Sequence, residues 1–290
     1  MDTKSVPDKV FSVIGSTFQL VSGLGKKHER RLWRDGVVAW DVDAAFPGVP
    51  APTVERLRPA MAEAQAALGR RDVAALAARI PSGEHWRLFA EFGDDAAYLD
   101  IETGDDVVGF AGISAIGILD RHGPHLWLAD DLESFPERAQ QWSMLVTFNG
   151  LSFDVPILRQ AFPDWQPPTC HVDLRHVLQR LGLGGGLKAI ERRLPSLHLS
   201  RPAHLAGMGG WDACSLFRRG RDGDVAALRR FAEYNLYDAI NLRTLMAYAY
   251  NSLVDAEAEE APALREATRA LAIPERGEVL YDVSKILLSL

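Results

Sequence analysis

The chain has 290 residues, of which 47% are hydrophobic and 24% charged, so it can bury a core and is neither disordered nor collagen-like. Its net charge of −7 argues against a protein that coats nucleic acid, and its two cysteines exclude a disulfide scaffold and a cysteine-rich zinc module. Because no apolar run approaches the roughly 20 residues that span a bilayer, and no signal-peptide core is present at the start, we expect a cytoplasmic protein without a membrane segment.

Residues 1–93 are predicted to form a helical accessory region. Apolar residues recur at helical spacing over 52–78 with one break at 69–72, which predicts two short helices. Near 20–36, a Gly-x-Gly turn is followed by a basic segment and resembles one helix-hairpin-helix element, whose backbone N–H groups can approach a phosphate of DNA. A plain turn before a helix is the alternative.

The pattern changes after residue 93. Short β-type runs at 96–102, 107–119 and 125–129 predict three strands joined by tight turns, and the continuous apolar run at 144–149 predicts a strand buried on both faces. A helical stretch is expected before this run, at 136–142, and helical segments follow it at 154–161, 174–181, 187–194, 213–219 and 224–250. This order predicts an α/β domain over 94–252, with three antiparallel strands followed by parallel strands in one mixed sheet flanked by helices, and a C-terminal tail over 253–290.

Two acidic residues lie side by side in the first predicted strand. Residues two apart in a strand point to the same face, so Asp100 and Glu102 share one face while Leu99 and Ile101 point to the other. Two carboxylates this close raise each other's pKa unless a cation neutralises them, and Mg²⁺ or Mn²⁺ suits such oxygen ligands. We therefore predict a metal site here, with a solvated pair on an edge strand as the alternative.

A third carboxylate follows the strand predicted at 144–149. That strand ends in Asn149-Gly150, and a helix begins at Asp154. In open α/β sheets the carboxyl ends of the strands line the binding crevice, which would place Asp154 beside Asp100. The alternative is that Asp154 only caps its helix, since aspartate is favoured at that position.

The last polar pair lies in the long predicted helix at 224–250. Tyr234 and Asp238 are four residues apart and therefore share one helix face. The two residues lie next to the apolar face of this helix, which includes Leu242 and Leu245. If Asp238 is buried with that face, its carboxylate requires a compensating charge. An exposed Asp238 beside an amphipathic tyrosine is the alternative.

The three patterns together resemble the motifs of the DEDD exonucleases, also called DnaQ-like, which have an RNase H-like fold. Asp100 with Glu102 matches the first motif, residues 149–154 the second, and Tyr234 with Asp238 the third. A tyrosine four residues before the last aspartate marks the tyrosine subfamily.

The likeness covers most of residues 17–250 and is closest to the bacterial YprB-like RNase H domain group. It rests on segments such as PSGEHWRLF, GLKAIERRL and GMGGWDACSLFRRG. The sequence departs from the family pattern at Asp105, where a threonine and a glycine are more typical nearby.

This resemblance implies hydrolysis of phosphodiester bonds with two Mg²⁺ or Mn²⁺ ions. Asp100 would bridge both ions. Glu102 and Asp154 would complete their coordination, and Asp238 would hold the ion that activates the attacking water. Four carboxylates balance two dications in formal charge, so no basic ligand is needed at the centre. Tyr234, whose ordinary pKa is about 10, would orient the water rather than take its proton.

Five further residues are candidates for substrate binding. Thr103, Asn149 and Phe153 lie close to the acids in sequence and would position the terminal nucleotide, with Phe153 stacking on a base. Burial of Phe153 in the core is the alternative. Lys188 and Arg192 are four residues apart and can contact phosphate from one helix face.

Basic residues gather in two segments although the chain is acidic overall. Residues 170–232 contain eleven bases and five acids, and residues 1–34 contain seven bases and three acids. Such segments can face phosphates, although a solvated helix face is the usual explanation of a charge run.

The sequence therefore predicts a metal-dependent 3′–5′ exonuclease that acts on single-stranded ends, with DNA favoured over RNA, in DNA repair or nucleic-acid turnover. The direction of degradation follows from the resemblance alone. Two alternatives remain open: a catalytically inactive nucleic-acid-binding scaffold that acts with a helicase, and a structure-selective endonuclease on the same fold.

Overall fold

The computed structural model describes residues 12–104, 109–199, 201–268, 270–273 and 286–287. Contacts divide the chain into two units, of which unit 1 comprises residues 1–92 and 250–271, and unit 2 comprises residues 93–249 and 272–290. Asp105 and most of the expected tail beyond residue 273 lie outside the described residues.

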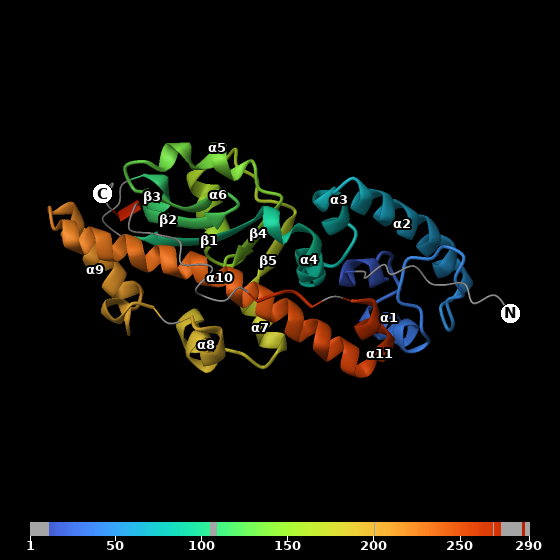
Figure 1. The fold of residues 1–290 in the computed structure, drawn as a ribbon. Coiled ribbons are helices and arrows are strands. Elements are labelled where there is room, and N and C mark those ends of the chain that lie inside the picture. The colour runs from blue at the N-terminus through green and yellow to red at the C-terminus, as the bar shows by residue number, and fades with distance from the viewer. Residues whose placement is uncertain (1–11, 105–108, 200, 269, 274–285, 288–290) are drawn as a thin grey trace. The chain divides into compact units, whose positions relative to one another are not determined.

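Unit 2 is built on a five-stranded mixed sheet with the order β3-β2-β1-β4-β5 (Figure 1). Its strands are β1 (Ala96–Thr103), β2 (Ile113–Asp120), β3 (Gly123–Leu128), β4 (Met144–Thr147) and β5 (Cys170–Asp173). The first three pair antiparallel, whereas β4 pairs parallel with both β1 and β5. The predicted α/β class with a mixed sheet is confirmed, and β5 is a strand that the sequence analysis did not predict.

The helices of unit 2 follow the predicted order. They are α5 (Phe135–Ala139), α6 (Asp154–Ala161), α7 (Leu174–Arg180), α8 (Leu187–Arg193), α9 (Gly210–Arg221) and the part of α10 (Val225–Glu260) that ends at residue 249. Short 3-10 turns lie at η3 (Gly93–Asp95), η4 (Phe110–Gly112), η5 (Leu132–Ser134), η6 (Pro195–Leu197) and η7 (Ala203–Leu205).

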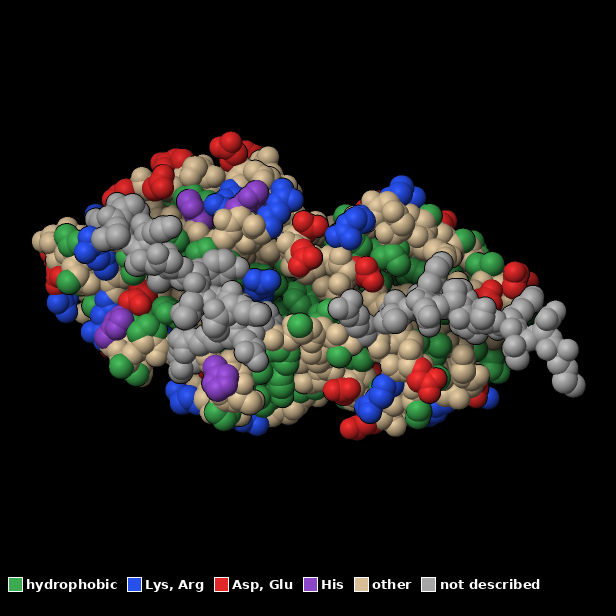
Figure 2. Space-filling view, in the orientation of Figure 1, with side chains coloured by type: hydrophobic (Ala, Val, Ile, Leu, Met, Phe, Trp, Pro, Cys, Tyr) green, Lys and Arg blue, Asp and Glu red, His purple; other side chains and the backbone are tan. Residues whose placement is uncertain are grey.

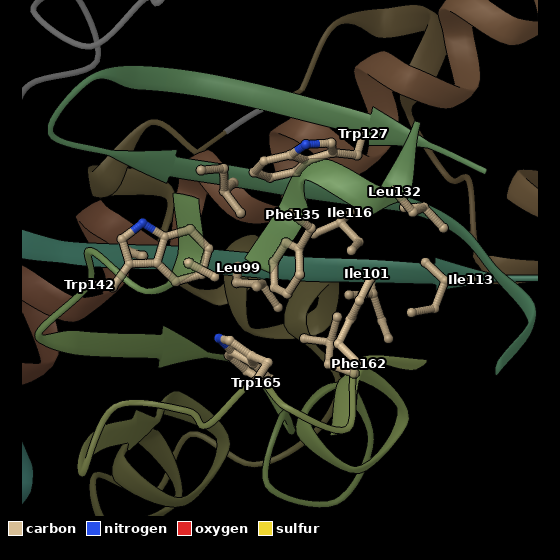
Figure 3. Packing of buried hydrophobic residues seen from close by; sticks show 14 of the residues in the cluster. Leu99, Ile101, Ile113, Ile116, Trp127, Leu132, Phe135, Trp142, Phe162 and Trp165 are labelled. Atoms are coloured by element: carbon tan, nitrogen blue, oxygen red, sulfur yellow. The ribbon is translucent and has the colours of Figure 1, made fainter. Parts of the chain in front are cut away.

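Alternation along β1 divides its side chains between the two faces of the sheet. Leu99 and Ile101 pack into a hydrophobic cluster with residues of α5, α6 and the segments around them, including Phe135, Phe162 and Trp165 (Figure 3). The polar residues of β1 therefore project from the opposite face. That face is the one that α10 approaches, as the hydrogen bonds described below show.

Unit 1 contains the N-terminal helices and the last part of α10. Its other elements are η1 (Val13–Ser16), α1 (Lys26–Arg34), α2 (Ala51–Gly69), α3 (Val73–Ala77), η2 (Ser82–Leu88), α4 (Phe89–Phe92) and α11 (Pro262–Ala267). The predicted break between α2 and α3 is confirmed. Arg71 there has a left-handed φ of 55°, and Asp72 caps α3 by accepting a hydrogen bond from the N–H of Ala75 at 3.0 Å.

A buried ionic network lies at the centre of unit 1. Arg87 has no exposed surface, and its guanidinium donates to both carboxylate oxygens of Glu29 at 2.9 Å and to Glu84 at 2.7 Å. The rings of Trp33 and Trp86 lie 5.4 and 5.6 Å from the guanidinium carbon. Because a buried charge is stable only when it is paired, this network fixes α1 against residues 82–88.

Several basic residues of α1 form ion pairs within unit 1. Lys26 and Arg30 both pair with Glu257 of α10 at 2.7 Å. Before α1, the described residues 12–25 form the 3-10 turn η1 and no α-helix. Residues 12–34 thus contain one α-helix, which follows the glycine turn, whereas a helix-hairpin-helix element has two. The positive charges of Lys26 and Arg30, which were expected to face phosphate, are neutralised by Glu257.

Candidate metal centre

Three carboxylates converge on the polar face of β1. Asp100 and Glu102 project from β1 and Asp238 from α10, and one oxygen of each lies within 4.8 Å of the other two. Oxygens about 2.1 Å from one Mg²⁺ are at most about 4.2 Å apart, so these three need shifts of less than about 1 Å to share an ion. The donor set therefore fits a hard divalent cation.

Asp154 reaches the same stretch of β1 from α6. Its side chain is buried, and Oδ1 accepts a hydrogen bond from the backbone N–H of Ile101 at 3.1 Å. Ile101 stands between Asp100 and Glu102, so Asp154 is adjacent to the converging acids without belonging to the compact set of three. The alternative that Asp154 only caps its helix does not explain the hydrogen bond that its side chain accepts from β1.

The loop between β4 and α6 is held by a residue that the sequence analysis missed. Asp173, at the end of β5, accepts hydrogen bonds from the backbone N–H groups of Asn149 at 2.8 Å and Leu151 at 3.1 Å. Asn149 adopts a left-handed φ of 68°, and a Cβ on Gly150 would lie 2.2 Å from Oγ1 of Thr147. The available signal was an aspartate that ends a short apolar run, as expected at the carboxyl end of a parallel strand.

Asn235 is a second residue that the sequence analysis missed. It is fully buried on α10, and its Nδ2 donates to both the side chain and the backbone carbonyl of Asp100. A Cβ at Gly117, which lies opposite Asp100 on β2, would come within 2.3 Å of Oδ1 of Asn235. The missing side chain at Gly117 therefore lets Asn235 approach β1.

Two basic side chains reach Asp238. Nζ of Lys188 lies 2.9 Å from Oδ2 of Asp238 and also donates to the hydroxyl of Tyr234. Arg201 pairs with Oδ1 of Asp238, and Glu191 holds Arg201 at 2.8 Å. A buried carboxylate requires a partner, and here the chain supplies it. Lys188, predicted to bind phosphate, therefore lies at the acidic centre itself.

Burial and mutual repulsion shift the pKa values of the centre. Burial, followed by the charges of Asp238 and Glu102, raises the pKa of Asp100 well above its ordinary value. Burial is also the main cause that raises the pKa of Glu102 to about 8 and that of Asp154 to about 7. The pKa of Tyr234 is raised by burial and then by Asp238, so its hydroxyl keeps its proton at neutral pH.

The remaining predicted substrate residues are distributed around this centre. Thr103 ends β1, and its carbonyl accepts a hydrogen bond from Sγ of Cys214 at 3.3 Å. The side-chain oxygen of Asn149 accepts from Arg175. Phe153 is 42% exposed, so the alternative that buries it in the core is wrong.

One exposed aromatic residue escaped the sequence analysis. Trp211, in the first turn of α9, is 88% exposed, more than any other large hydrophobic side chain among the described residues. It lies about one helical turn before Cys214, whose Sγ donates to the backbone carbonyl of Thr103. The residues around Trp211 in the sequence give no sign that it is exposed rather than buried in the core.

Comparison with known proteins adds one finding to this geometry. A family model described as the RNase_H superfamily matches residues 97–250, more than half of the chain. The chain belongs to the RNase H superfamily. Members of this superfamily are usually nucleases, and the matched RNase H-like segment contains β1, the loop before α6 and the acidic part of α10.

Neither curated proteins nor solved structures gave a match to this RNase H superfamily member. Among its described residues, no helix has the length and apolar character needed to cross a membrane.

Proposed function

We propose that this protein is a 3′–5′ exonuclease of the DEDD type, tyrosine subfamily, that hydrolyses phosphodiester bonds at single-stranded ends. The convergence of Asp100, Glu102 and Asp238, with Asp154 bonded to the strand between the first two, is the observation that carries the proposal. Membership in the RNase H superfamily supports it. The polarity, the likeness to the YprB-like group, the cytoplasmic location and a role in DNA repair rest on the sequence motifs and composition.

The four acids would hold two Mg²⁺ or Mn²⁺ ions, which supply Lewis-acid stabilisation of the phosphoryl oxygens and an acidified water when bound. Asp100, at the middle of the group, is oriented by Asn235. Asp154 is held in place by its bond to Ile101. These contacts fix the carboxylates before substrate arrives, which reduces the reorganisation that the reaction requires.

Tyr234 orients the attacking water through its hydroxyl. The phenol is buried against Asp238, and its raised pKa keeps it a donor rather than a base. Nζ of Lys188 lies 4.2 Å from the centre of the Tyr234 ring and donates to the hydroxyl, which fixes its direction. The same ammonium group is placed to contact the phosphate that lies at Asp238.

The substrate strand is proposed to pass the exposed aromatic residues beside the centre. Phe153 and Trp211 offer ring faces on which bases stack with little sequence preference. Thr103 and Asn149 lie at the strand ends that flank the acids and would position the terminal nucleotide. Lys and Arg side chains over α8 and α9 provide charge for the phosphate backbone (Figure 2). Single-stranded DNA is the favoured substrate, with RNA as the second candidate.

Degradation of matched single-stranded DNA and RNA, labelled at either end, tests this proposal. With Mg²⁺ or Mn²⁺ the protein should shorten strands from the 3′ end, and EDTA should stop the reaction. Asp154→Asn should lower the rate on the order of 10³-fold or more, whereas Asp164→Asn, an exposed acid just after α6, should leave it unchanged.

Other outcomes of that assay would contradict the proposal. Equal degradation by the wild-type protein and Asp154→Asn would remove the catalytic assignment. Binding of strands without shortening would identify a scaffold, and cleavage of circular strands would identify an endonuclease.

A further inference from the structure

A cavity of about 390 Å³ adjoins the acidic centre within unit 2. Its wall is formed by three residues of α8 (Lys188, Glu191 and Arg192) and by Pro195, His198, Leu199, Arg201 and residues 205–208. Lys188 and Arg201 belong to its wall and also pair with Asp238, so the cavity and the acidic centre share these two side chains. The volume lies in the range of about 300–1,000 Å³ that is usual for small-molecule sites.

The charged part of the cavity wall is basic. It contains Lys188, Arg192 and Arg201 against one acid, Glu191. That acid is already engaged, because it accepts hydrogen bonds from Arg201 at 2.8 Å and from Asn241 at 2.8 Å. Asp238, outside the wall, pairs with Lys188 and Arg201, which leaves Arg192 as a wall cation without an ion pair among the described residues, so an anion that enters the cavity can meet its charge.

Arg201 carries an unused donor. Its side chain is only 7% exposed, and Nη1 is buried without a hydrogen-bond partner among the described residues. Buried polar groups of folded proteins are almost always paired, so an unpaired guanidinium nitrogen beside a cavity indicates a place for an acceptor from a ligand. Phosphate oxygens match guanidinium donors well.

The remainder of the wall is apolar. This part of the wall consists of Pro195, Leu199, Leu205 and Met208. The side chains of Leu199, Leu205 and Met208 are almost fully buried. A flat heterocyclic ring can pack against such a surface, and the thioether of a methionine makes favourable contacts with aromatic rings. The wall as a whole suits a ligand that joins an anionic group to a flat ring.

We propose that this cavity binds a nucleoside monophosphate, the nucleotide that the exonuclease reaction releases. Its phosphate lies against Lys188, Arg192 and Arg201, and its base lies against the apolar residues. The assignment rests on the proposed function, because that reaction produces the nucleotide next to Asp238. Occupancy of the cavity by product slows further turnover.

Calorimetric titration of the full chain in EDTA tests the cavity without any catalysis. Adenosine 5′-monophosphate should bind saturably, and both adenosine and inorganic phosphate should bind at least about tenfold more weakly, because each lacks half of the contacts. Arg192→Ala should weaken binding of the monophosphate about fivefold or more. Arg193→Ala removes the same charge from the next position of α8, which does not line the cavity, and should leave the affinity unchanged.

A second pair of variants tests the cavity space. Ala206→Trp places a large ring at an exposed position of the wall and should abolish binding, whereas Ala203→Trp, exposed in the same segment but outside the wall, should not. Circular dichroism melting verifies that both variants fold, and the arginine pair remains decisive if either does not.

The outcomes separate this inference from the proposed function. Equal affinity for phosphate and the monophosphate, or unchanged binding by Ala206→Trp, would overturn the cavity assignment. Strand degradation by a protein that does not bind the monophosphate would do the same while leaving the exonuclease standing. Binding by a protein that degrades no strand would support the cavity and remove the exonuclease.

Discussion

Nδ2 of Asn235 lies 2.9 Å from a carboxylate oxygen of Asp100 and 3.1 Å from the backbone carbonyl oxygen of the same residue. One amide group thus fixes both the side chain and the main chain of the strand residue at the middle of the acidic group. Since this amide touches the acid and not the proposed ions, Asn235 is a positioning residue.

Replacing Asn235 should weaken metal binding. Asn235→Ala removes the donor that orients Asp100, and loss of such a supporting contact costs about 10- to 100-fold in metal affinity. Titration with Mn²⁺, followed by electron paramagnetic resonance, measures this change directly. Asn251→Ala, which removes an amide of the same helix that bonds Leu271 in unit 1, is the control and should bind Mn²⁺ normally. An unchanged affinity in the folded Asn235→Ala variant would contradict the role.

The raised pKa of Glu102 predicts how stability depends on pH without metal. The folded protein retains the proton of Glu102 up to about pH 8, whereas the unfolded chain releases it near its ordinary pKa of 4.5. The folded state therefore binds more protons across this window, and its stability falls as pH rises from about 4.5 to about 8.

Glu102→Gln should remove that loss. In EDTA the variant should melt close to the wild-type temperature at pH 5 and on the order of 10 °C higher at pH 9, because a pKa raised from 4.5 to about 8 corresponds to roughly 5 kcal/mol and each kcal/mol to about 2–4 °C in a domain of this size. Calorimetric melting over this pH range measures the difference. Glu137→Gln, which removes an exposed carboxylate of α5, is the control for the substitution itself. The same small difference for Glu102→Gln at every pH would show that the carboxylate ionises normally.

The buried network of unit 1 predicts a large loss of stability on removal of Arg87. Arg87→Ala leaves Glu29 and Glu84 without their buried partner, and such a change costs about 3–5 kcal/mol. Urea unfolding measures the free energy. Arg79→Ala removes a pair with the exposed Glu63 and should cost less than about 1 kcal/mol. Similar effects of the two variants would mean that burial adds nothing to the Arg87 network.

Exposure of Trp211 predicts an effect on substrate binding without one on folding. Trp211→Ala should weaken binding of single-stranded DNA by about 1–3 kcal/mol, the usual contribution of one stacked base. Its melting temperature should stay the same, because 88% of the side chain is already in water. Fluorescence anisotropy with a labelled oligonucleotide, with the exposed Val225→Ala as control, tests this. Wild-type affinity in Trp211→Ala would place the strand elsewhere.

The acidic group was predictable because each of its parts follows a local period. Asp100 and Glu102 obey the two-residue alternation of a strand, and Tyr234 and Asp238 obey the four-residue spacing of a helix. The side chains that compensate the acids were not predictable in the same way. Arg201 reaches Asp238 from a segment without regular periodicity, and its pairing depends on tertiary structure alone.

The end of the long helix shows a second limit of sequence patterns. The acidic run at 255–262 is typical of a solvated helix end or linker, and α10 ends within it at Glu260, but the run is not solvated throughout. Glu257 within that run has a side chain only 3% exposed, because Lys26 and Arg30 neutralise it. Bases more than 200 residues away in the sequence thus decide the conformation here.

The loop that presents Asp154 takes its shape from Asp173, on a strand that contributes nothing to the acidic group itself. Transplanting the four acids onto another protein scaffold would therefore fail unless β5 were transferred with them. Without β5, the loop before Asp154 would lack the hydrogen bonds that fix its backbone, and the Asp154 side chain would no longer be held against the central strand.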